Sequence, residues 1–142
     1  MIKKIIYRQP FQSTAAAVQV VNPQALLAAI SALKKDLAAK LQPELTAVYK
    51  QCATAEAASG EYSPDPASIG RRRLRDTCLA YLSSLDTPET TALCMAQLKS
   101  ARCITDALSA FQSISKVSGA ERLEASKLFH DIVKDDPLGL DK

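Results

Sequence analysis

The sequence has little of several residue types that support catalysis. It contains no tryptophan, a single histidine and four glycines in 142 residues, and aromatic residues make up 5% of it. Because a helical zinc site needs two histidines one turn apart, a single histidine excludes it. The scattered glycines form no phosphate-binding loop, and no apolar run approaches the roughly eighteen residues of a membrane span. The sequence therefore predicts that the chain is not an enzyme and has no metal, no cofactor, no small-molecule substrate and no transmembrane segment.

The histidine and the four cysteines also lack partners for chemistry. His130 follows Phe129 near the end of a predicted helix, where a protonated ring is stabilised by the helix dipole, so we expect a surface or capping role. The cysteines include no Cys-x-x-Cys pair, and no pattern places His130 near any of them as a base. We interpret them as small buried residues of a protein from a reducing compartment. They are Cys52, Cys78, Cys94 and Cys103.

The sequence does contain clear signals for the starts of helices. Apolar residues make up 47% of the chain, and its length suffices for one domain with a core. A proline follows a capping or helix-breaking residue at four places, which predicts four helix starts. These are Asn22-Pro23, Gln42-Pro43, Asp65-Pro66 and Thr87-Pro88. After the first start, apolar residues recur at helical spacing, at Leu26, Ile30, Leu33, Leu37 and Leu41.

Two further helices complete the predicted fold. Thr105 is expected to cap the fifth helix, and Ser118 with Glu121 to form a capping box for the sixth. Residues 55–63 are expected to form a loop, and Asp136-Pro137 to end the last helix. Six helices with short links predict an all-α protein of three antiparallel pairs, which form a short α-solenoid segment of the HEAT or armadillo type.

Four stretches of the chain resemble one known domain in their order and spacing. They read Glu-Tyr-Ser-Pro-Asp at residues 61–65, Gly-Arg-Arg-Arg-Leu-Arg-Asp-Thr-Cys-Leu-Ala-Tyr-Leu at residues 70–82, Ile-Thr-Asp-Ala-Leu-Ser-Ala at residues 104–110 and Lys-Asp-Asp-Pro-Leu-Gly-Leu-Asp-Lys at residues 134–142. Together they resemble the C-terminal helical domain of the aminopeptidase N family of zinc peptidases. The resemblance runs from about Val21 to the last residue and implies the helical domain without the catalytic one. We therefore divide the chain into a tail, residues 1–20, and a helical module, residues 21–142.

The tail carries basic and hydroxylated residues but no acidic ones. The first acidic residue of the chain is Asp36, which is typical of an organellar targeting segment. The alternative is an extended tail that docks on a partner. We predict a mitochondrial protein, with chloroplast or cytoplasm as alternatives. The predicted partner contacts in the tail are Lys3, Lys4, Ile5, Ile6, Tyr7 and Arg8.

A second predicted contact is the basic cluster formed by Arg71, Arg72, Arg73 and Arg75. If it faces solvent, it could dock on RNA phosphates or on an acidic protein surface. The alternative is structural, in which the arginines pair with acidic residues of neighbouring helices. The candidate acidic residues are Glu61, Asp65 and Asp106.

Two classes of function follow, with a third behind them. The first is a non-catalytic accessory subunit of a larger mitochondrial complex (a respiratory complex, the ATP synthase or the ribosome), in which the chain serves as a helical scaffold for other protein subunits. The second is a regulatory or complementing piece of an aminopeptidase, which the resemblance implies. The third is a helical RNA-binding module, whose affinity would fall steeply with salt.

Overall fold

The computed structural model describes residues 22–60, 62–117 and 119–135. Within these ranges the protein is helical and contains no strand, which confirms the predicted all-α class. The helices are α3 (Pro23–Lys40), α4 (Gln42–Ala58), α5 (Pro66–Leu82), the short 3-10 helix η1 (Ser83–Leu85), α6 (Pro88–Lys99), α7 (Ile104–Ile114) and α8 (Glu121–Val133).

The predicted helix starts at Asn22, Asp65 and Thr87 are confirmed. The Asn22 side chain accepts a hydrogen bond from the backbone N–H of Ala25 at 3.0 Å. Asp65 caps α5 in the same way, and hydrogen bonds from Ser68 hold the pKa of its carboxyl well below the usual range. Thr87 forms a capping box with Thr90 at the start of α6. These side chains satisfy backbone N–H groups that a helix start leaves without partners.

Three boundaries differ from the prediction. Helix α4 continues to Ala58, into the first part of the loop predicted for residues 55–63, because alanine and glutamate favour helix there. Helix α7 begins at Ile104 after Cys103, which makes no side-chain cap, so the predicted cap at Thr105 is wrong. Helix α8 begins at Glu121 after Ala120, so Glu121 is the first helical residue and the predicted capping box is wrong. Residues 118 and 136–142, including the predicted end of the last helix, lie outside the described residues.

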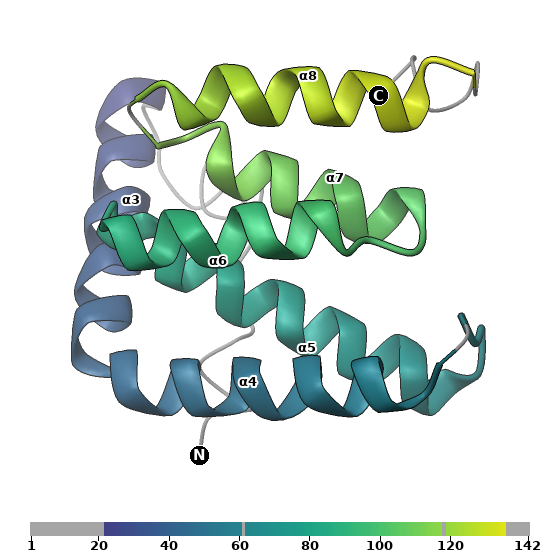
Figure 1. Ribbon diagram of the computed structural model, residues 1–142. Helices are drawn as coiled ribbons and strands as arrows, with labels where there is room; N and C mark the ends of the chain where they lie inside the picture. The colour runs from purple at the N-terminus through teal and green to yellow at the C-terminus, as the bar shows by residue number, and fades with distance from the viewer. Residues whose placement is uncertain (1–21, 61, 118, 136–142) are drawn as a thin grey trace.

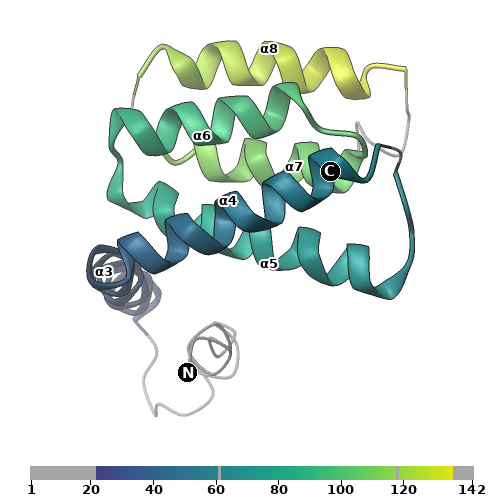
Figure 2. The same cartoon turned by 60° about the horizontal axis from the view of Figure 1, so that its bottom comes forward.

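Helices α4 to α8 form a stack, and α3 stands across one end of it (Figures 1 and 2). Helix α4 packs on α5, α6 on α7, and α7 on α8. The pairing therefore differs from the predicted three consecutive pairs, since α3 does not lie alongside α4. The cause is the link, because Leu41 is the only residue between the two helices and Pro43 lies in the first turn of α4. Proline cannot continue the hydrogen bonds of a preceding helix, so the chain turns sharply.

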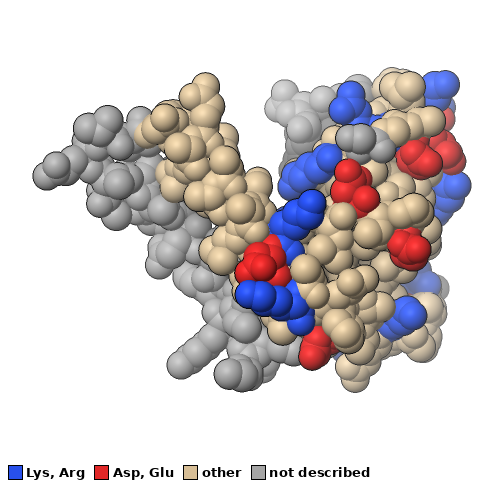
Figure 3. Space-filling model, turned by 90° about the vertical axis from the view of Figure 1, so that its left-hand side faces the viewer, with Lys and Arg blue, Asp and Glu red and all other residues tan. Residues whose placement is uncertain are grey.

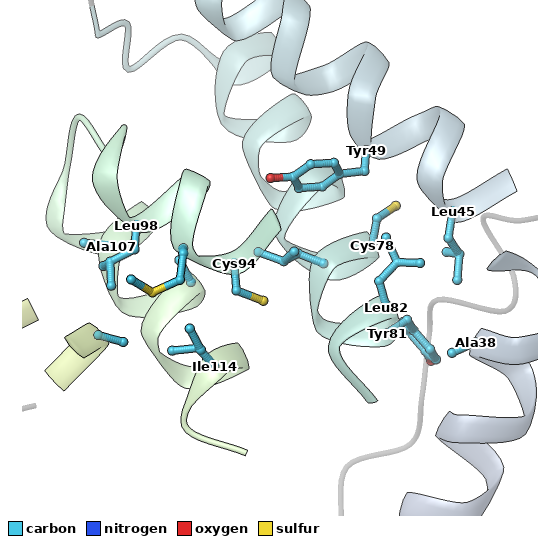
Figure 4. Packing of buried hydrophobic residues seen from close by; sticks show 14 residues of the cluster. Ala38, Leu45, Tyr49, Cys78, Tyr81, Leu82, Cys94, Leu98, Ala107 and Ile114 are labelled. Atoms are coloured by element: carbon cyan, nitrogen blue, oxygen red, sulfur yellow. The ribbon is translucent and has the colours of Figure 1, made fainter. Parts of the chain in front are cut away.

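The core consists of small and medium-sized residues, as the composition predicts (Figure 4). Leu79, Leu82, Leu98 and Ile114 are its largest fully buried aliphatic side chains. Between α7 and α8 the rings of Phe111 and Phe129 stack with their centroids 4.6 Å apart. Fully buried alanines allow the helices to approach closely; they are Ala38, Ala107, Ala110 and Ala125.

The four cysteines are free thiols. Cys52, Cys78 and Cys94 are buried, and Cys103 is half-buried. Burial raises the pKa of Cys78 to about 11 and that of Cys94 to about 12. Thiols with such pKa values stay protonated near neutral pH and are poor nucleophiles. The prediction of small buried cysteines is confirmed for Cys52, Cys78 and Cys94, whereas Cys103 is only half-buried.

Candidate functional site

Two arginines of α5 are buried inside the stack. Arg72 and Arg75 lie one turn apart on the same face of α5 and are 6% and 8% exposed. Arg72 Nη1 lies 3.0 Å from Glu56 Oε1 of α4. Arg75 Nη2 lies 3.0 Å from Asp106 Oδ2 of α7, and Arg72 Nε lies 3.9 Å from the other oxygen of the same carboxylate. Asp106 therefore bridges both guanidinium groups.

Helix α6 joins the same set of contacts. The Gln97 side chain donates a hydrogen bond from Nε2 to Asp76 Oδ1 at 2.8 Å, and Arg75 Nε lies 3.5 Å from that oxygen. Burial raises the pKa of the Asp76 carboxyl, although Arg75 and Gln97 oppose the rise. We call the whole set the arginine network; it consists of Glu56, Arg72, Arg75, Asp76, Gln97 and Asp106.

Two further contacts connect the arginine network to residues outside it. The guanidinium of Arg72 lies over the ring of Tyr62, 4.6 Å from its centroid, in cation–π contact. Arg102 donates from Nη1 to the backbone oxygen of Glu56 at 3.1 Å, which ties the end of α4 to the α6–α7 connection. Tyr62 belongs to the loop motif of residues 61–65, so three of the four sequence motifs meet here.

The arrangement holds helices together. Its members supply charges and hydrogen bonds that link α4, α5, α6 and α7. Such a network contributes mainly by fixing which helices pack together, because removing one member leaves the others buried without compensation. Among the described residues, no group of three or more His, Cys, Asp or Glu side chains could hold a metal ion.

A cavity of about 260 Å³ lies beside the network, between α4 and α6. Small residues of the two helices form its sides, including Ala53, Ala57 and Ala96. Tyr49 spans it by donating from its hydroxyl to the backbone oxygen of Leu93 at 3.5 Å. Burial raises the pKa of that Tyr49 hydroxyl to about 12, so it remains a neutral donor at ordinary pH.

This geometry rules out the solvent-facing alternative for two of the four arginines, Arg72 and Arg75. Arg72 and Arg75 turn inward, because buried carboxylates on α4 and α7 compensate their charges. Arg71 is half-buried and donates from Nη2 to Ser68 Oγ at 2.6 Å, and Arg73 is exposed. Contact with RNA or a partner protein stays a prediction for Arg71 and Arg73.

The structural alternative for the cluster is confirmed in part. Asp106 is the predicted acidic partner, whereas Asp65 caps α5 and Glu61 lies outside the described residues. Glu56 was missed, because its segment was predicted to be a loop. The helical spacing of the buried residues of α4 carried the missing signal, since their positions continue to residue 56 at steps of four, three and four. They are Leu45, Tyr49, Cys52 and Glu56.

Three further predictions concern His130, membrane-spanning helices and the tail. His130 is exposed on α8, in agreement with the expected surface position. None of the described helices combines the length and the hydropathy needed to cross a bilayer. The tail residues lie outside the described residues, and their partner contacts stay predictions. They are Lys3, Lys4, Ile5, Ile6, Tyr7 and Arg8.

Comparison with known proteins identifies the domain. A family described as "Domain of unknown function (DUF3458_C) ARM repeats" matches residues 5–142. Aminopeptidase N of Caulobacter vibrioides is 31% identical over 124 residues, which are 87% of this chain and 14% of the relative. The chain thus spans about a seventh of that relative, and the family match starts upstream of Val21. The chain belongs to this family of ARM-repeat domains, and its predicted resemblance to the C-terminal helical domain of aminopeptidase N is confirmed.

Proposed function

We propose that the chain acts as a non-catalytic helical interaction domain of an aminopeptidase N-type enzyme. The observation that carries this proposal is the alignment of most of the chain with a small part of an aminopeptidase. A single histidine cannot form the zinc motif, so the peptidase chemistry has to come from residues outside this sequence.

The last helix of the stack offers a surface for such an interaction. On α8, Leu123 is 66% exposed. A helical-repeat stack normally buries such side chains against the next unit. The arginine network fixes α4 to α7 beneath this helix, so α8 is presented on a firm support. We infer that α8 packs against another part of the enzyme.

Complementation tests this proposal. We expect the chain to bind a Caulobacter aminopeptidase N from which the aligned segment has been deleted, and to change its rate of hydrolysis of an aminoacyl substrate. Leu123→Asp should weaken binding by about tenfold or more, since burying a leucine is worth about 1.5–3 kcal/mol. Ala47→Asp is the matched control, because Ala47 is exposed on α4, away from α8. Neither binding nor a change of rate at saturating concentration would count against the proposal.

A second candidate is an accessory subunit of a mitochondrial complex, which the acid-free stretch before Asp36 favours. Gentle extraction of the endogenous protein followed by a native gel and mass spectrometry of the band separates the candidates. Migration with many other subunits supports the accessory role, and deletion of residues 1–20 should then release the chain. Migration with a peptidase, or as a free species, rejects that role.

A further inference from the structure

The first half of α3 presents apolar side chains that the described residues do not cover. Leu27 is 54% exposed and Leu33 is 55% exposed, while Leu26 and Ile30 are partly buried. Ala38 is the one residue of this helix that is buried. In Figure 3 the first turns of α3 project from the helical body as an arm without charged side chains on the visible side.

The position of α3 explains this exposure. Leu27 and Ala38 are eleven residues apart, so they lie on the same face of the helix. Ala38 is fully buried because the second half of α3 rests on α5 and η1. Leu27 lies about three turns earlier, near the start of the helix, and there the same face is left 54% exposed. The uncovered face is therefore continuous with one that the core already uses.

The segment that precedes α3 is uncharged, like the exposed first half of α3. No charged residue occurs between Arg8 and Lys34, so residues 9–21 and the first half of α3 are both uncharged. A solvated tail is normally rich in charge and poor in branched aliphatic residues. Residues 9–21 instead contain Phe11, Val18, Val20 and Val21. The family match from residue 5 includes this segment in the repeat domain.

We propose that residues 9–21 fold back over the first half of α3 in the same chain and cover Leu26, Leu27, Ile30 and Leu33. Thirteen residues can extend over roughly 40 Å, and the eleven residues 23–33 of the helix span only about 16 Å. Direct linkage gives the segment an effective concentration in the range of about 1 mM or more, which favours it over a second copy of the chain.

Charged residues on either side of the uncharged stretch limit how far residues 9–21 extend over α3. Lys3, Lys4 and Arg8 precede the uncharged segment, and Lys35 and Lys40 lie exposed on the second half of α3. Like charges held close together repel one another. The proposed cover therefore extends over residues 23–33 and ends before the lysines of the second half of α3.

Hydrogen exchange of the whole chain tests the proposal. Deletion of residues 2–20 should speed exchange of the amides of residues 27–33 by roughly tenfold or more, since burial of one leucine is worth at least that factor. Amides of α5 and α7 should exchange as before. Val18→Asp should act like the deletion, whereas Gln19→Asp, which places the same charge one residue later, should have a small effect. The point variants decide the matter if the deletion fails to fold.

Two results would overturn the proposal. If exchange of residues 27–33 is the same with and without residues 2–20, the segment does not cover the helix. If their protection rises with protein concentration and light scattering shows a dimer, a second copy covers the face instead. This test involves no peptidase, so its outcome is independent of the proposed function.

Discussion

Replacing Asp106 by alanine should lower the free energy of unfolding by about 3–5 kcal/mol, the usual cost of removing one partner from a buried ion pair. Asp106 is 3% exposed and bridges Arg72 and Arg75, so its loss leaves two buried guanidinium groups without this compensation. Urea unfolding followed by circular dichroism measures the effect as a lower midpoint with an unchanged slope. Asp106 also lies in the first turn of α7, so the change removes an acidic charge that stabilises the start of this helix.

Asp131→Ala is the matched control. The Asp131 side chain is 65% exposed and pairs with Lys134 at 3.5 Å on the surface of α8. Exposed ion pairs contribute at most about 1 kcal/mol, because water and salt screen them. If Asp106→Ala and Asp131→Ala destabilise the protein equally, the arginine network does not hold the helices together.

Leu79→Ala should lower the free energy of unfolding by about 2–5 kcal/mol. Leu79 is 0% exposed on α5, at the centre of the core, so truncation removes buried methyl groups and leaves a cavity that rigid helices on several sides cannot fill. Thermal and urea unfolding should both report the loss. Leu123→Ala serves as the control, since Leu123 is 66% exposed and a surface change should stay within about 0.5 kcal/mol. Equal losses in the two variants would mean that α5 is not the centre of the core.

The network also gives the family motifs a physical meaning. Residues 70–82 supply the two buried arginines, residues 104–110 supply the aspartate that bridges them, and Tyr62 covers one of them. These stretches are separated along the chain but meet between α4, α5 and α7. Three of the four motifs that carry the resemblance to aminopeptidase N therefore hold helices of the domain together.

Local chemistry determined much of this protein from the sequence alone. Proline after a capping residue places the starts of α3, α5 and α6, because those side chains act on backbone groups only two or three residues away. The pairing of Asp106 with the arginines was one of two alternatives that the sequence left open.

Only the tertiary structure decided the remaining features. Glu56 becomes a partner of Arg72 because α4 continues beyond its expected end and lies beside α5. The inward turn of Arg72 and Arg75 depends on carboxylates from two other helices, which no local pattern specifies. The burial of Ala38 on α3, which leaves Leu27 and Leu33 uncovered, depends on how α3 packs on α5 and η1. Helix starts rest on contacts within one turn, whereas burial of charge rests on which distant segments become neighbours.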